Sequence, residues 1–163
     1  MMKKILGIVV LALLLSGNAY AELITLTKCY IVKYDDTDGE NFSYRNWDEQ
    51  TSAKTSAGLY IFDFENRLYT LDTVTEVITE TRVMRDSYIN RQKQRNNLII
   101  KKYRKIIFKV TDLGGNVATA IDIDLGHLLD HTVDVDFATN KVYTFRKDKW
   151  STNSSTQQCK RQK

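Results

Sequence analysis

At 163 residues, with a net charge of +4 and no proline, the chain is long enough to bury one hydrophobic core and too short for two. The lack of proline excludes polyproline recognition segments and proline-stiffened linkers. The sequence also has no glycine-rich phosphate loop, nucleophile elbow or dinucleotide-binding fingerprint, so it indicates no common enzyme class.

The first 21 residues have the layout of a secretory signal peptide. Two lysines precede an apolar run, residues 5–15, and Ala19 and Ala21 supply the small residues that signal peptidase accepts. This run is shorter than the roughly 20 residues of a membrane-spanning helix, and the residue directly after the expected cleavage point is Glu22 instead of the cysteine of a lipoprotein. We therefore expect cleavage after Ala21 and export to the periplasm or the exterior. The mature part, residues 22–163, is expected to form a single domain without a transmembrane span.

The mature part contains two cysteines, Cys29 and Cys159. Because exported proteins mature in an oxidising compartment, a disulfide between them is the default expectation. It would close a loop of about 130 residues and stabilise the fold by roughly 4–5 kcal/mol on the chain-entropy model. It would also hold the polar C-terminal tail, residues 151–163, which otherwise has little reason to be ordered. Free thiols or a bridge to another chain are the alternatives.

Alternating hydrophobicity predicts strands in the first half of the mature part. Residues 23–34 alternate and are rich in β-branched and aromatic side chains, which is typical of a strand. Residues 35–58 are polar and predict a long loop. Residues 59–71 predict a hairpin that turns at Glu65-Asn66.

Residues 73–92 fit two interpretations. Thr73 and Glu76 have the spacing of a capping box, and the apolar residues that follow approximate a helical stripe. The many threonines and valines favour a strand instead. We expect a helix here.

The second half predicts consecutive hairpins. A strand over residues 98–111 is followed by a Gly-Gly turn and a strand over 117–125, with Ile121, Ile123 and Leu125 on one face and the aspartates on the other. Residues 132–147 predict a second hairpin, turning at Thr139-Asn140. The expected fold is mainly β, an antiparallel meander that closes as a barrel or packs as a sandwich.

Charge is distributed in blocks, with a basic block over residues 82–109 and an acidic block over 110–140. A basic face suits an anionic partner, and export makes nucleic acid an improbable one. Alternatively, the blocks pair about the Gly-Gly turn, placing Lys105 near Asp124 and Lys109 near Ala120 within one residue. Residues outside that pairing form the expected anion-binding set: Arg82, Arg85, Arg91, Lys93 and Arg95.

Both histidines lie in the acidic block. Imidazole and carboxylate ligands together suit zinc or another divalent ion, and an aspartate can also act as a general base. The spacing of the two histidines is not that of a zinc protease, since Leu128 stands where the catalytic glutamate is needed. The candidate metal set is His127, His131, Asp130, Asp124 and Asp134.

These observations favour a non-enzymatic binding or accessory protein of the cell envelope, without a cofactor and with an unidentified envelope or extracellular partner. A metal-dependent hydrolase that uses the histidine and aspartate set is the first alternative. A small-ligand carrier is the second, because aromatic residues are frequent in the first half of the chain and could line a cavity.

Overall fold

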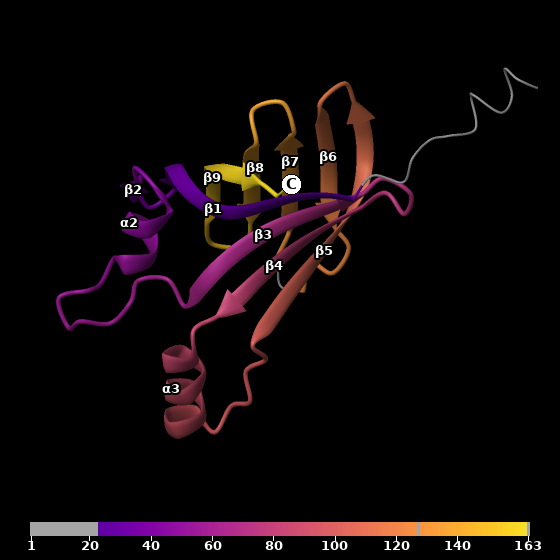
Figure 1. Cartoon of the computed structure of the whole chain (residues 1–163). Coiled ribbons are helices and arrows are strands. Elements are labelled where there is room, and N and C mark those ends of the chain that lie inside the picture. Colours follow the sequence, from indigo (N-terminus) through magenta and orange to yellow (C-terminus); the bar gives the residue numbers. More distant parts are fainter. Residues whose placement is uncertain (1–22, 127, 163) are drawn as a thin grey trace, which may run out of the picture.

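The computed structural model describes residues 23–126 and 128–162, which form antiparallel strands and two short helices (Figure 1). In chain order these elements are β1 Leu23–Asp36, β2 Asn41–Phe42, α2 Trp47–Ser52, β3 Phe64–Asp72, β4 Val77–Met84, α3 Asp86–Asn96, β5 Tyr103–Gly114, β6 Val117–Asp122, β7 Asp130–Asp136, β8 Lys141–Lys147 and β9 Thr152–Arg161. Within the described part of the chain, no helix combines the length and the apolarity that crossing a membrane requires.

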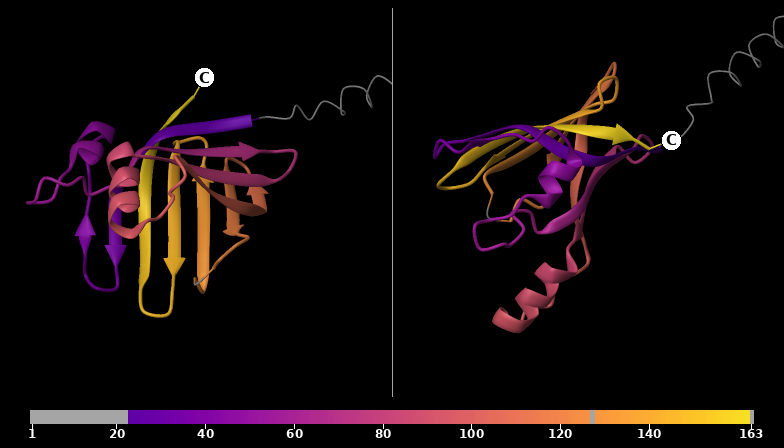
Figure 2. Two further views of the ribbon diagram at one scale, coloured as in Figure 1. Left: turned by 90° about the horizontal axis from the view of Figure 1, so that it is seen from below. Right: turned by 60° about the vertical axis from the view of Figure 1, so that its left-hand side comes forward.

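Eight of the described strands close into an antiparallel barrel. The sheet runs β1-β3-β4-β5-β6-β7-β8-β9, and β9 pairs back onto β1 (Figure 2). The short β2 pairs with the C-terminal end of β1, beyond the part that pairs with β3. The prediction of a mainly β meander is therefore confirmed, and the strands form a barrel rather than a sandwich.

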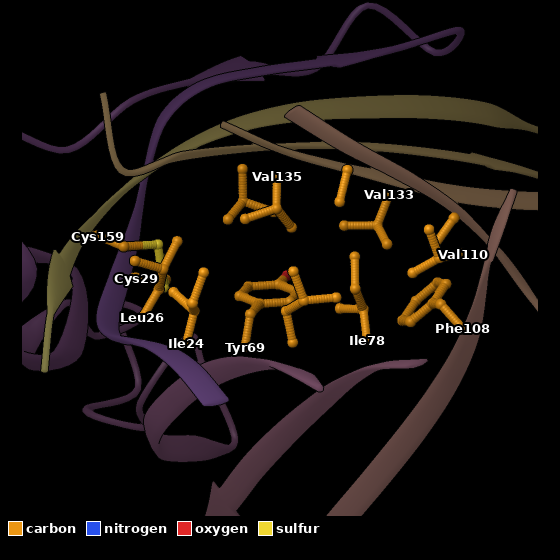
Figure 3. Packing of buried hydrophobic residues seen from close by; sticks show 14 residues of the cluster. Ile24, Leu26, Cys29, Tyr69, Ile78, Phe108, Val110, Val133, Val135 and Cys159 are labelled. Atoms are coloured by element: carbon orange, nitrogen blue, oxygen red, sulfur yellow. A yellow bond between two sulfur atoms is a disulfide. The ribbon is translucent and has the colours of Figure 1, made fainter. Parts of the chain in front are cut away.

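The barrel interior follows the two-residue alternation of its strands, because every second side chain points inward. Figure 3 shows Ile24, Tyr69 and Ile78 on one side of the core, facing Val133 and Val135 on the other. In β6 the inward residues Ala118 and Ala120 are fully buried and small, which suits the interior of a narrow barrel.

The disulfide joins Cys29 of β1 to Cys159 of β9, as the sequence predicted. It lies at a bulge in β1, where the pairing register shifts between Thr27 and Tyr30 and Lys28 takes a positive φ of 52°. The bulge lets β1 bend at the point where the barrel closes.

The polar C-terminal tail, which was expected to be ordered only through the disulfide, forms a strand of its own. Residues 152–161 form β9, which pairs with β8 on one side and with β1 on the other. The inward residues Gln157 and Cys159 are nearly fully buried, although the strand lacks hydrophobic alternation. Pairing on both edges satisfies its backbone groups and stabilises a strand of low apolar content.

The hairpin predicted over residues 59–71 is wrong as well. β3 runs without a turn through Glu65 and Asn66, where the pairing register with β4 shifts. The turn-forming residues thus occupy a bulge, which inserts a residue without reversing the chain.

Residues 73–92 contain the end of a turn, a strand and the start of a helix, so the helix expected over the whole segment was wrong in its first half. β4 occupies Val77–Met84, and α3 begins only at Asp86. The supposed capping box is the β3–β4 turn, in which Asp72 accepts hydrogen bonds from the amides of Val74 and Thr75 and Glu76 has a φ of 54°. The β-branched residues that follow pair on both sides, with β3 and β5.

The two later hairpins form where the sequence predicted them, at Gly115 and at Asn140, which both have positive φ values. β5, the first strand of the earlier hairpin, begins at Tyr103, whereas the sequence predicted a strand from residue 98. Lys109 lies opposite Ile121, within the predicted tolerance of one residue.

The faces of β6 are the reverse of the expected ones. Asp122 points into the barrel and is buried, whereas Ile121 and Ile123 are 44% and 61% exposed. Ala118 and Ala120 point inward, and because side chains alternate along a strand, Asp122 points inward as well. Opposite charges therefore do not meet across this hairpin as the sequence suggested.

The segment expected to be a long loop contains β2 and α2. Gln50 of α2 is fully buried, and its Oε1 accepts a hydrogen bond of 2.6 Å from the backbone amide of Ile31. The loop is also fixed by a chain of ring contacts that begins with Tyr34 stacked on Phe42, with centroids 4.3 Å apart, and ends at Phe62 and Phe64. These aromatic residues pack on one another and hold the loop against the barrel.

Candidate functional site

The candidate metal residues do not converge in the described part of the chain. His131 points into the barrel, where its Nδ1 lies 2.8 Å from the Oδ2 of Asp122 and its ring packs edge-on against Phe108. Asp134 lies on the outer face of the same strand, and Asp124 and Asp130 are exposed. His127 lies outside the described residues. Among the described residues, no group of three or more His, Cys, Asp or Glu side chains is arranged to hold a metal ion.

The five expected anion-binding residues divide into three environments. Arg82 points into the barrel, and Lys93 and Arg95 lie exposed on the last turn of α3. Arg85 lies 3.9 Å from the ring centroid of Tyr60 and donates hydrogen bonds to two backbone carbonyls. Arg91 forms an ion pair of 3.3 Å with Asp63. Anion binding by this set as a whole stays a prediction.

Arg85 and Arg91 line a hollow of about 210 Å³ between α3 and the segment before β3, together with Tyr60, Phe62 and Tyr88. The contacts of both guanidinium groups with this segment hold α3 beside it. The hollow therefore marks the joint between α3 and the loop, and both of its arginines are already engaged.

The polar end of the barrel interior holds a buried charge cluster. The Glu80 carboxylate of β4 is 1% exposed and forms ion pairs with Arg67 of β3, at 3.4 Å, and with Arg82 of β4, at 2.5 Å. Burial raises the pKa of Glu80, but the two guanidinium groups and the hydrogen bond from Arg82 outweigh it, so the pKa lies below its usual value. Burial lowers the pKa of Arg67, which still remains protonated at neutral pH.

Two further polar contacts adjoin this cluster inside the barrel. The phenol of Tyr69 and the side chain of Gln157 are hydrogen bonded, and both are almost completely buried. Burial raises the pKa of Tyr69 well above its usual value. His131 and Asp122 complete the polar region, and His131 lies near enough to lower the pKa of Glu80.

A groove of about 260 Å³ lies on the outer face of β7, β8, β9 and β1. The strand register builds it from two rows of side chains, each crossing four adjacent strands. The first row is Asp134, Tyr143, Thr156 and Lys33, and the second is Thr132, Phe145, Ser154 and Asp35. Tyr143 is 40% exposed.

The groove offers both hydrogen-bond donors and acceptors beside two aromatic rings. Its serine and threonine hydroxyls can each donate and accept, while Asp134 only accepts. Lys33 and Asp35 neutralise one another through an ion pair of 2.7 Å. This combination suits an uncharged, polyhydroxylated ligand better than an ion.

Sequence reasoning did not find this groove, because its residues come from β1 and from β7 to β9, at opposite ends of the described part of the chain. The hairpin over residues 132–147 was predicted, but nothing in the sequence indicated that β9 and β1 would lie beside β8. The sequence matches no known protein family model and no curated protein, and the structure matches no solved structure.

Proposed function

We propose that this chain is an exported, non-enzymatic binding protein of the cell envelope, and that it binds a neutral saccharide in the groove on β7, β8, β9 and β1. The observation that carries the proposal is the pair of side-chain rows in that groove, which bring aromatic rings, hydroxyl groups and a carboxylate onto one surface. A sugar ring needs an apolar surface for its C–H face together with mixed donors and acceptors for its hydroxyls.

The carboxylates of the groove support binding without hydrolysis. Glycoside hydrolysis requires two carboxyl groups that act together, one as acid and one as base or nucleophile. Of the described residues that line the groove, Asp35 and Asp134 carry carboxylates, and Asp35 is held by Lys33 at 2.7 Å. Among the described residues of the groove, Asp134 is then the one carboxylate outside an ion pair, whereas hydrolysis needs two that act together, and this supports binding without hydrolysis.

The test is titration calorimetry of the mature protein with a panel of neutral mono- and disaccharides, including glucose, galactose, mannose and N-acetylglucosamine. Tyr143→Ala removes an aromatic ring of the groove and should weaken binding by at least about tenfold. Tyr103→Ala is the matched control, because Tyr103 is also an exposed tyrosine but lies on β5, away from the groove.

Equal binding of a saccharide by the wild type and by Tyr143→Ala contradicts the proposal. So does a wild type that binds no sugar of the panel. The bound sugar should also be recovered intact after incubation. Release of a shorter saccharide would instead establish hydrolysis and overturn the non-enzymatic assignment.

A further inference from the structure

Three arginines form a row across adjacent strands at the polar end of the barrel. Arg67 of β3 lies opposite Arg82 of β4, and Arg82 lies opposite Arg104 of β5. The row crosses the three strands near the end of β4 that leads into α3.

All three arginines occupy inward positions of their strands. Arg67 shares the parity of the buried Tyr69, Arg82 that of the buried Glu80, and Arg104 that of the buried Phe108. Side chains directly opposite one another have Cβ atoms roughly 4.5–5.5 Å apart, and like charges at this separation destabilise a sheet. The row therefore carries an electrostatic cost in the unliganded protein.

The charges of the row are only partly compensated. Glu80 forms ion pairs with Arg67 and Arg82, so two guanidinium groups share one carboxylate. Among the described residues, none forms a hydrogen bond or an ion pair with Arg104. Asp63 lies near Arg104, but its carboxylate is paired with Arg91 at 3.3 Å. The uncompensated charge is thus greatest at Arg104.

The exposure of the arginine side chains increases along the row from Arg67 to Arg104. The side chain of Arg67 is 8% exposed and that of Arg82 is 30% exposed, while Arg104 is exposed. Arg67 is also fixed by Phe64, with the guanidinium carbon 4.5 Å from the ring centroid. The inner arginines are therefore preorganised, and the outer one meets solvent.

We infer that this arginine row is a binding site for a phosphate group, with Arg82 and Arg104 as its contacts and Arg67 and Glu80 as the residues that position Arg82. A guanidinium group offers parallel N–H donors that match two oxygens of one phosphate. The Nε of Arg82 is used by Glu80, which leaves its terminal nitrogens for a ligand. The site lies at the barrel end and is separate from the saccharide groove on the outer face of other strands.

The phosphate group can belong to a soluble molecule or to a lipid head group, and two binding experiments distinguish these sources. The first is titration calorimetry of the mature protein with inorganic phosphate at low ionic strength. The second is co-sedimentation with vesicles of phosphatidylglycerol, compared with vesicles of phosphatidylcholine. Binding in the first experiment assigns a soluble ligand, and binding to phosphatidylglycerol vesicles alone assigns a lipid. Absence of binding in both overturns the inference.

Arg104→Gln is the test variant, since Arg104 is exposed and its removal breaks no described hydrogen bond. It should weaken binding by at least about tenfold, and Arg104→Lys should restore part of the loss because lysine keeps the charge without the planar fork. Lys105→Gln is the matched control: it removes one positive charge from the neighbouring residue, which points outward. Equal binding by Arg104→Gln and the wild type contradicts the site.

A second readout uses the repulsion within the row. Without ligand, Arg104→Gln should raise the midpoint of thermal unfolding by roughly 1–4 °C, because it removes a like-charge pair. Phosphate should raise the midpoint of the wild type and not that of the variant. A purely structural arginine would instead lower the midpoint on removal, and that result would overturn the inference.

Discussion

Cys29 of β1 is bonded to Cys159 of β9 where the first and last strands of the barrel meet, so the disulfide fastens the seam of the closed sheet. Every other neighbouring pair of barrel strands is consecutive in the chain, except for β1 and β3, which are separated by the short β2 segment. The seam alone joins the first described strand to the last, so its formation requires closure of a very long loop.

Replacing both cysteines by serine should destabilise the protein by about 4–5 kcal/mol, because the reduced chain loses this constraint on its unfolded state. Urea unfolding of the wild type and of the double variant measures the difference, and the wild type with reductant should match the variant. Equal midpoints for oxidised and reduced wild type would show that the backbone pairing of β1 and β9 suffices for closure.

Gln50 should be important for stability although it lies in a loop region. Its Oε1 is the acceptor for the amide of Ile31 at 2.6 Å, and both groups are buried. Gln50→Met keeps the volume and leaves that amide without its acceptor, at a cost of about 1–3 kcal/mol in the free energy of unfolding. Asp48→Asn on the exposed face of α2 is the control, with an expected change below about 0.5 kcal/mol. Similar unfolding midpoints for the two variants would contradict this role.

Hydrophobic alternation predicted the strands whose inward residues are apolar. It located β1, β7 and β8, and the glycine pair and Asn140 located the hairpin turns. It failed for β9, because the inward residues Ser155 and Gln157 are polar and the strand exists only through its two neighbours. A local pattern cannot contain that information.

The arginine row shows the same limit. Each of its arginines lies an even number of residues from a buried side chain of the same strand. This spacing is a signal in the sequence that the charge points inward. Which arginines lie opposite one another depends on the register of β3, β4 and β5, which is continuous from the β3–β4 turn through Arg67 and Arg82 and is not visible in the sequence. The composition of the basic block predicted a basic surface, whereas the structure places Arg82 of that block against the buried carboxylate of Glu80.

The buried charge cluster predicts a specific acid sensitivity. The pKa of Glu80 is lower in the folded protein than the value of about 4.3 in an unfolded chain, so at acid pH the unfolded state binds more protons. The stabilisation by Glu80 is therefore complete above that unfolded value and is lost as the pH falls through the folded pKa. At pH 7, Glu80→Gln should cost about 3–5 kcal/mol, because Arg67 is left buried without a partner.

Urea unfolding between pH 3 and pH 7 measures both effects of Glu80, and the difference between wild type and variant should shrink at the acid end. Glu76→Gln, in the exposed turn between β3 and β4, is the control and should change the stability by less than about 0.5 kcal/mol. A constant difference between wild type and Glu80→Gln over the whole range would contradict the predicted ionisation of Glu80.

Tyr34 should ionise unusually late in an alkaline titration. Burial raises its pKa to about 12, assisted by the hydrogen bond of 2.9 Å that its hydroxyl donates to Asp36 and by the charge of that carboxylate. Since the phenol in an unfolded chain has a pKa of about 10, the folded protein keeps this proton over a range in which the unfolded chain loses it. The stabilisation by Tyr34 is complete below pH 10 and is lost as the pH rises through 12.

Absorbance at 295 nm follows tyrosinate formation, and subtracting the titration of Tyr34→Phe from that of the wild type isolates Tyr34. The difference should rise well above pH 10. Asp36→Asn removes the carboxylate while leaving the burial, so in that background the Tyr34 transition should move to lower pH. If the Tyr34 transition stays at the same pH in Asp36→Asn, burial alone raises the pKa of Tyr34. The hydrogen bond from Tyr34 to Asp36 then has no electrostatic role.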